Sequence, residues 1–238
     1  MNGFEKIIHM LRRDYYGGFF MILFELAAII IGLFSVSKDK TTVFFLAYLF
    51  LDFILLSTDF YLRISFSGRV RKYSIFIATT NGLISLVELL VYYYFFFKII
   101  RNRVIIKWMR FFRVAFVCVA TLFIITQFSF LTKRYSYVAN MITVLEFLFL
   151  LLPSFAYFYE LFKNEPIKNL YAHRSFWIVT GIFFYAVISI PYYLLDRFVY
   201  FNYPDFDGIL SLIFYYTPFT CNFIFLARAF LCKNTLTI

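Results

Sequence analysis

Acidic side chains lie inside the long apolar runs of this chain, where almost no other charged residue occurs. Glu25, Asp52 and Glu146 each stand among aromatic and aliphatic residues. A charged carboxylate at the centre of a bilayer costs about 2.5–3.5 kcal/mol on insertion scales, so each of these groups needs a partner or a purpose. Asp52 and Asp59 are seven residues apart, a spacing that puts both on one face of a helix.

Most of these polar positions fall at one depth in their runs. At about 1.5 Å per residue, they lie about 10–15 Å from the membrane side at which the chain begins. We therefore expect a polar layer with a cavity that binds a ligand or an ion, lined by Glu25, Asp52, Asn81, Glu88, Glu146, Tyr215 and Tyr216. An entrance is expected at Asp59, Gln127 and Tyr192. Helix kinks that free backbone carbonyls are expected at Pro153, Pro191 and Pro218.

No basic residue lies inside the runs to neutralise these acids, because every Lys, Arg and His falls in a loop or at a run end. Two interpretations stay open. Either the carboxyl groups are protonated and serve as interhelical hydrogen-bonding contacts, or they are charged and face water, a cation or a cationic ligand. For Asp59 and Glu160 we expect local partners, since Arg63 and Lys163 follow them at the run ends.

The runs that carry these residues are long enough to be transmembrane helices. Of the 238 residues, 63% are hydrophobic and 15% charged, whereas a soluble domain is about half apolar and a quarter charged. About 20 apolar residues in a helix cross the hydrocarbon core. We predict an all-α integral membrane protein, a seven-transmembrane-helix bundle with spans near 17–36, 43–62, 74–97, 111–130, 138–162, 176–195 and 209–231.

The segments outside the spans carry the net charge of +10. Residues 1–16 combine apolar and basic residues at helical spacing and predict a short amphipathic helix on the membrane surface, and residues 232–238 form a short tail. Loops on the C-terminal side carry slightly more Lys and Arg, which favours an N-out, C-in orientation. A basic loop, residues 98–110, is expected to contact anionic lipid or a partner protein through Arg101, Arg103, Lys107, Trp108 and Arg110. Nucleic acid is excluded as a partner, because no domain is present to read a groove.

Motifs of known catalytic and cofactor sites are missing from the sequence. No His lies within a run to bind zinc or iron, and no His-Glu-x-x-His, Gly-x-Ser-x-Gly or phosphate-binding loop occurs. The last run has no Lys for a retinal Schiff base. We therefore expect no catalytic residue, no metal and no cofactor. A lipid-modifying enzyme remains a third class, without a visible nucleophile.

One helical hairpin carries a family resemblance. It comprises Tyr157-Phe-Tyr-Glu-Leu-Phe162, Pro166, Leu170, Ser175-Phe-Trp-Ile178, Gly181-Ile-Phe-Phe-Tyr185 and Pro191. These residues resemble uncharacterised seven-span proteins of Bacteroidetes-type bacteria, which are similar to the membrane sensor regions associated with histidine kinases. The resemblance implies a role in membrane signalling, with a separate signalling protein on the cytoplasmic side as the partner.

Two functional hypotheses follow. The first is a bacterial inner-membrane sensor or accessory receptor, which acts through a separate cytoplasmic or membrane signalling protein. The alternative is a small transporter or channel for protons, cations or amines that uses the same acids, with the prolines allowing helix movement. Self-association into a homo-oligomer stays open.

Overall fold

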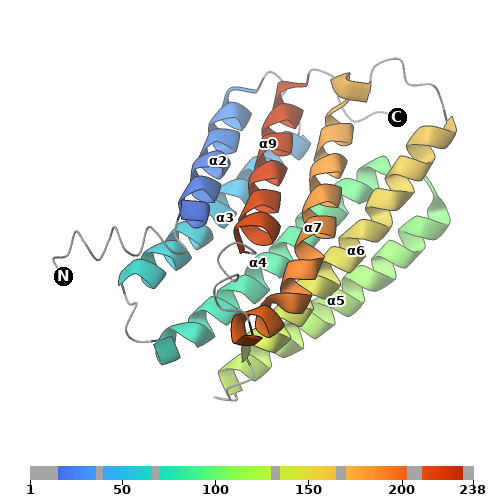
Figure 1. The fold of residues 1–238 in the computed structure, drawn as a ribbon. Helices are drawn as coiled ribbons and strands as arrows, with labels where there is room; N and C mark the ends of the chain where they lie inside the picture. Colours follow the sequence, from blue (N-terminus) through green and yellow to red (C-terminus); the bar gives the residue numbers. More distant parts are fainter. Residues whose placement is uncertain are drawn as a thin grey trace.

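Helices make up the part of the chain that the structure describes. The structure is a computed structural model, and it describes residues 16–35, 40–65, 70–129, 135–164, 170–202 and 211–232. Successive helices run in alternating directions (Figure 1). The helices are α2 (Tyr16–Leu33), α3 (Lys40–Ser65), α4 (Val70–Ile99), α5 (Arg103–Ser129), α6 (Tyr135–Asn164), α7 (Arg174–Asn202) and α9 (Thr217–Leu231), with a 3-10 turn η2 (Leu170–Ala172) and a π-helical turn η3 (Leu212–Tyr216).

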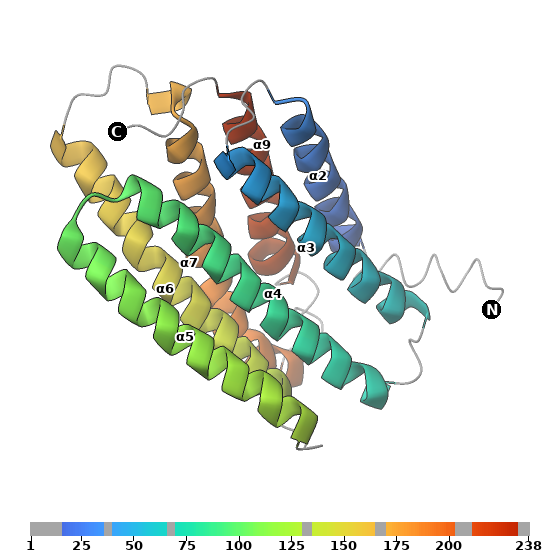
Figure 2. The same ribbon diagram turned by 180° about the vertical axis from the view of Figure 1, so that it is seen from behind.

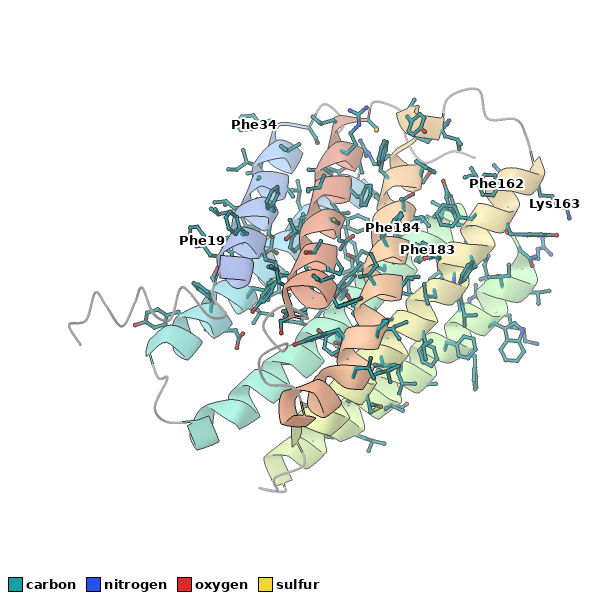
Figure 3. The ribbon with its side chains drawn as sticks, in the orientation of Figure 1. Phe19, Phe34, Phe162, Lys163, Phe183 and Phe184 are labelled. Carbon is teal, nitrogen blue, oxygen red and sulfur yellow. The ribbon has the colours of Figure 1, made fainter. Side chains whose placement is uncertain are left out.

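The composition of these helices is that of an integral membrane protein. Within the described residues, α3 to α7 are each long and apolar enough to cross a membrane, and α2 contributes a shorter apolar helix. Large apolar side chains cover the outside of the bundle. Figure 3 shows Phe19, Phe34, Phe162 and Phe184 there, and each is at least 45% exposed. Soluble proteins do not expose apolar surface on this scale, so lipid is the solvent of this face.

Six of the described helices form a closed ring. Each packs against two neighbours in the order α2, α3, α4, α6, α7, α9 and back to α2. The remaining helix, α5, packs outside the ring against α4 and α6 (Figure 2). The ring therefore encloses an interior of its own, and α5 adds Phe116, Ala120 and Phe123 to the same hydrophobic core from outside the ring.

Aromatic rings fill much of that interior. Phe147 of α6 meets the ring of Tyr185 of α7 with centroids 4.8 Å apart, and Tyr185 meets Phe219 of α9 at 4.5 Å. Such edge-to-face pairs add to the apolar burial that holds the helices together. The abundance of Phe and Tyr thus serves both the lipid-facing surface and the core.

The structure corrects the predicted start of the fourth span. The sequence suggests a basic loop over residues 98–110, whereas α5 already begins at Arg103. The side-chain oxygen of Asn102 accepts hydrogen bonds from the backbone N–H groups of Val104 and Ile105, at 2.9 and 3.4 Å. Asn102 is therefore the N-cap of α5, and most of the basic residues lie on the first turns of a helix.

Two predicted segments lie outside the described residues. They are nearly all of the amphipathic N-terminal segment, residues 1–15, and nearly all of the C-terminal tail, residues 233–238. Tyr16 already belongs to α2, and Cys232 is the C-cap of α9.

Candidate functional site

Four buried carboxyl groups meet inside the ring. They are Glu25 of α2, Asp52 of α3, Glu88 of α4 and Glu146 of α6, called the acid cluster below, and each is at most 2% exposed. Asp52 lies within electrostatic range of the other three, and Glu88 lies within range of Glu146. The sequence has no Lys, Arg or His within one helical turn of any of these positions. The bundle thus encloses a group of acids at its centre.

Glu25 and Asp52 form one half of the cluster. Their carboxyl groups lie within hydrogen-bonding range of each other. None of their four oxygens has a donor partner among the described residues. Two carboxyl groups in contact form a hydrogen bond only when one of them carries a proton, and two charged ones repel each other strongly in a low-dielectric interior.

Glu88 and Glu146 form the second half of the cluster. Glu88 lies beside the hydroxyl of Tyr92, and Glu146 beside the hydroxyl of Ser85. One oxygen of each carboxyl group, Oε1, still lacks a partner within the described part of the chain. A buried oxygen without a donor is costly, so these acceptors point to something that supplies hydrogen atoms or positive charge.

A chain of hydroxyl and amide groups leads away from Asp52. Asn222 of α9 donates a hydrogen bond of 2.9 Å from Nδ2 to the hydroxyl of Tyr92. Tyr92 lies next to Tyr48, and Tyr48 lies next to Asp52. Tyr48 and Asp52 are neighbours without a hydrogen bond between them, because neither oxygen of Asp52 has a hydrogen-bond partner among the described residues. The order along this chain is Asn222, Tyr92, Tyr48, Asp52, Glu25.

Sequence reasoning did not assign Tyr48, Tyr92 or Asn222 to the site. The spacing carried a signal for the two tyrosines, since each lies four residues from an acid on its own helix, Tyr48 before Asp52 and Tyr92 after Glu88. Side chains four residues apart are neighbours on a helix surface. Asn222 had no comparable signal, because its partner lies on another helix.

Aromatic side chains of α7 and η3 close the cluster on one side. Tyr185 and Tyr193 lie within electrostatic range of Glu88 and Glu146. The ring of Tyr193 packs against Phe147 at 5.7 Å and against Tyr215 at 6.0 Å. With these residues, every helix of the ring places a polar side chain around the cluster.

The other predicted lining and entrance residues are placed as follows. Tyr215 and Tyr216 are half-buried in η3, and Tyr216 lies against Gly17. The hydroxyl of Tyr192 lies 3.3 Å from that of Ser211. Asp59 is buried on α3. The side chains of Asn81, Gln127 and Arg63 lie outside the described part of the structure, and with them the expected partner of Asp59.

The three prolines have different surroundings. Pro153 is buried within α6, and the carbonyl oxygen of Phe149 one turn earlier accepts a 3.0 Å hydrogen bond from the hydroxyl of Tyr93. Pro191 is exposed within α7. Pro218 lies two residues after the end of the π-helical turn η3, and the hydroxyl of the intervening Thr217 donates to the carbonyl of Leu212 at 2.7 Å. A proline interrupts the hydrogen bonding of a helix, and π-helical turns are frequent at functional sites.

Glu160 has a different partner from the one expected. Its two carboxylate oxygens accept hydrogen bonds from the backbone N–H groups of Arg101 and Asn102, at 3.1 and 3.0 Å. The expected partner, Lys163, instead lies over the ring of Tyr159. Glu160 therefore joins α6 to the start of α5. The predicted lipid- or partner-contacting residues are all exposed at that start: Arg101, Arg103, Lys107, Trp108 and Arg110.

A buried arginine joins three helices at the opposite end of the ring from η3. Arg174, the first residue of α7, is 1% exposed. It donates hydrogen bonds to the hydroxyl of Thr42 at 2.7 Å and to the carbonyl oxygens of Ala229 and Cys232 at 3.2 Å. A cation at the C-terminus of a helix satisfies its last carbonyls and its dipole. The predicted spans place Arg174 in the loop between residues 162 and 176.

No group of three metal-binding side chains in a suitable arrangement occurs among the described residues. A comparison with protein-family models finds no match, and comparisons with curated proteins and with solved structures find none either.

Proposed function

We propose that this protein is a receptor-like sensor of a bacterial inner membrane, with seven spans in which α2 is the first and η3 with α9 the last, oriented N-out and C-in. The observation that carries the proposal is the burial of four acids from four helices, within electrostatic range of one another, inside one closed ring. A change in the charge of such a cluster alters the contacts of several helices at once, which is how a local electrostatic event becomes a change of conformation.

Two further features favour sensing over transport. The acids are buried in a closed ring, and aromatic pairs pack beside them. Many secondary transporters are built from internal repeats, and this sequence has no recognisable repeat.

The output of the sensor would pass through the exposed basic start of α5. Arg103, Lys107 and Arg110 are all exposed there, and Trp108 is 57% exposed. Clustered basic residues at a membrane surface attract anionic lipid headgroups, and the same charge attracts an acidic face of a signalling protein. The link to the acid cluster runs through α4 and α6, against which α5 packs.

Transport of protons or small cations is the second candidate. The feature in its favour is the π-helical turn η3 followed by Pro218, because interrupted helices are typical of transporter binding sites.

Reconstitution separates the two candidates. The full chain carries two Trp residues, so Trp108→Phe leaves Trp177 of α7 as the only indole. We expect Trp177 emission to change when proteoliposomes receive a pH or cation jump, with no uptake of protons or cations. Asp52→Asn and Glu146→Gln should abolish the emission change. Uptake that these substitutions abolish would instead establish the transporter and overturn the sensor.

A further inference from the structure

We propose that the acid cluster binds a proton, that Glu25 and Asp52 hold this proton between them, and that Tyr48 and Tyr92 relay it. This inference rests on the proposed function, since it names the ligand of the same site. Its test follows protonation of the cluster and not signalling, so the proton site and the proposed function can fail separately.

The first argument is the deficit of donors around the pair. The four oxygens of Glu25 and Asp52 are buried acceptors without a donor within the described residues. A single shared proton supplies the missing donor and removes one of two adjacent negative charges.

The second argument comes from α7, which is independent of the acids. Ser189 is 0% exposed, and its hydroxyl oxygen has no partner among the described residues. It lies four residues from both Tyr185 and Tyr193, so all three share one helix face, and the two tyrosines lie beside Glu88 and Glu146. An unpartnered polar group therefore lies on the face of α7 that borders the cluster.

Asn222 provides a third observation, on α9. Its Oδ1 oxygen is buried and has no partner in the described part of the chain. A Cβ atom at Gly181 would lie only 2.8 Å from this oxygen, so the glycine leaves it just enough space. The Asn222 amide donates to the hydroxyl oxygen of Tyr92, which turns the proton of Tyr92 away from Asn222 and toward Glu88 or Tyr48. Asn222 is thus a positioning residue for the relay.

The surroundings of the cluster favour a proton over a larger ligand. The described residues offer no group of three side chains that could hold a metal ion. The rings beside the cluster already pack against one another, with Phe147 and Tyr185 at 4.8 Å and Tyr185 and Phe219 at 4.5 Å, so they offer no open face to an organic ammonium ion. A proton needs no such space.

Among the described residues, the titratable groups in and around the cluster, from the elements packed there, are acids and phenols. They are Tyr48 of α3, Glu88 and Tyr92 of α4, Glu146 of α6, Tyr185 and Tyr193 of α7, and Tyr215 and Tyr216 of η3. Uptake adds one proton to the pair. In the relay, each hydroxyl passes on its own proton and receives another, so only the pair changes its charge.

The test is infrared spectroscopy of the full chain in lipid nanodiscs, recorded as the pH is varied. We expect a protonated-carboxyl band that disappears with rising pH. Glu25→Gln and Asp52→Asn should each remove the band or shift its midpoint by about one pH unit or more, because the two groups titrate together. Glu160→Gln, which changes a carboxyl group outside the cluster, should leave the midpoint unchanged.

Two milder variants guard against misfolding. Tyr48→Phe and Asn222→Ala keep both acids, and each should shift the midpoint or slow the band change after a pH jump. A midpoint and a rate that stay unchanged in Glu25→Gln, Asp52→Asn, Tyr48→Phe and Asn222→Ala would overturn the proposal, as would a band that follows the concentration of Na⁺ or K⁺ at constant pH. A titrating band without any change in Trp177 emission would instead keep the proton site and reject the sensor.

Discussion

The hydroxyl of Tyr93 in α4 donates a 3.0 Å hydrogen bond to the carbonyl oxygen of Phe149 in α6. This carbonyl lies four residues before Pro153, and a proline has no N–H with which to complete the helical bond. A side chain of one helix therefore supplies the donor that its neighbour lacks. The bond lies one turn beyond Glu146 and thus ties α4 to α6 close to the acid cluster.

Tyr93→Phe tests this bond. It should lower the free energy of unfolding by about 1–3 kcal/mol, because the carbonyl of Phe149 is left without a donor. The added substitution Pro153→Ala restores an N–H to α6, and it should recover part of this loss. Thermal unfolding in detergent measures both. If Pro153→Ala has the same effect whether or not the Tyr93 hydroxyl is present, the two sites are independent.

Arg174→Met tests the junction of α3, α7 and α9. We expect a loss of at least about 2 kcal/mol in unfolding free energy, since three hydrogen bonds from a buried guanidinium disappear together. Arg228→Met is the matched control, because Arg228 is exposed and only lies over the ring of Trp177. Its effect should stay within about 1 kcal/mol. Equal effects of the two substitutions would argue against a structural role for Arg174.

Gly181→Ala tests the close packing of α7 on α9. The added methyl group would lie 2.8 Å from Asn222 Oδ1 and 2.9 Å from Phe225 Cβ, so the helices must separate at a cost of about 1–3 kcal/mol. At Gly82 the nearest atoms would be 3.6 Å away, an ordinary contact. Gly82→Ala should therefore be neutral or stabilising, as expected for alanine within a helix. Thermal unfolding of the two variants, side by side, gives the comparison.

Glu160→Ala tests the link between α6 and the start of α5. The amide hydrogens of Arg101 and Asn102 lose their acceptors, so we expect faster hydrogen exchange at these two residues, as measured by mass spectrometry. Lys163→Ala should leave their exchange unchanged, because Lys163 interacts with Tyr159 instead. Faster exchange in both variants would mean that the end of α6 has frayed generally.

The sequence was sufficient to predict the helical, membrane-bound character of the chain and the burial of its acids. The length of the apolar runs predicts membrane-spanning helices. The cost of placing a charge in hydrocarbon predicts that Glu25 and Asp52 lie inside the bundle and not on its lipid-facing surface. The sequence did not predict that α5 begins at Arg103. The basic composition of residues 98–110 suggested a loop, whereas Asn102 caps a helix that begins within this basic segment.

Long-range partners explain what the sequence did not predict. Arg174 finds Thr42 across 132 positions, and Asn222 finds Tyr92 across 130. Spacing along one helix carries no information about such pairs, since they depend on which helices become neighbours in the ring. The positions of Tyr48 and Tyr92 beside the acids could have been predicted from the sequence, because each lies one helical turn from an acid.

The position of α5 outside the ring bears on how this sequence can evolve. A substitution in the shared interior of the other helices changes the space available to a residue of another helix, so replacements there must be matched by a second change. The outward face of α5 meets no such partner among the described residues. Among descendants of this sequence, we expect paired, compensating replacements across the ring and independent drift along α5.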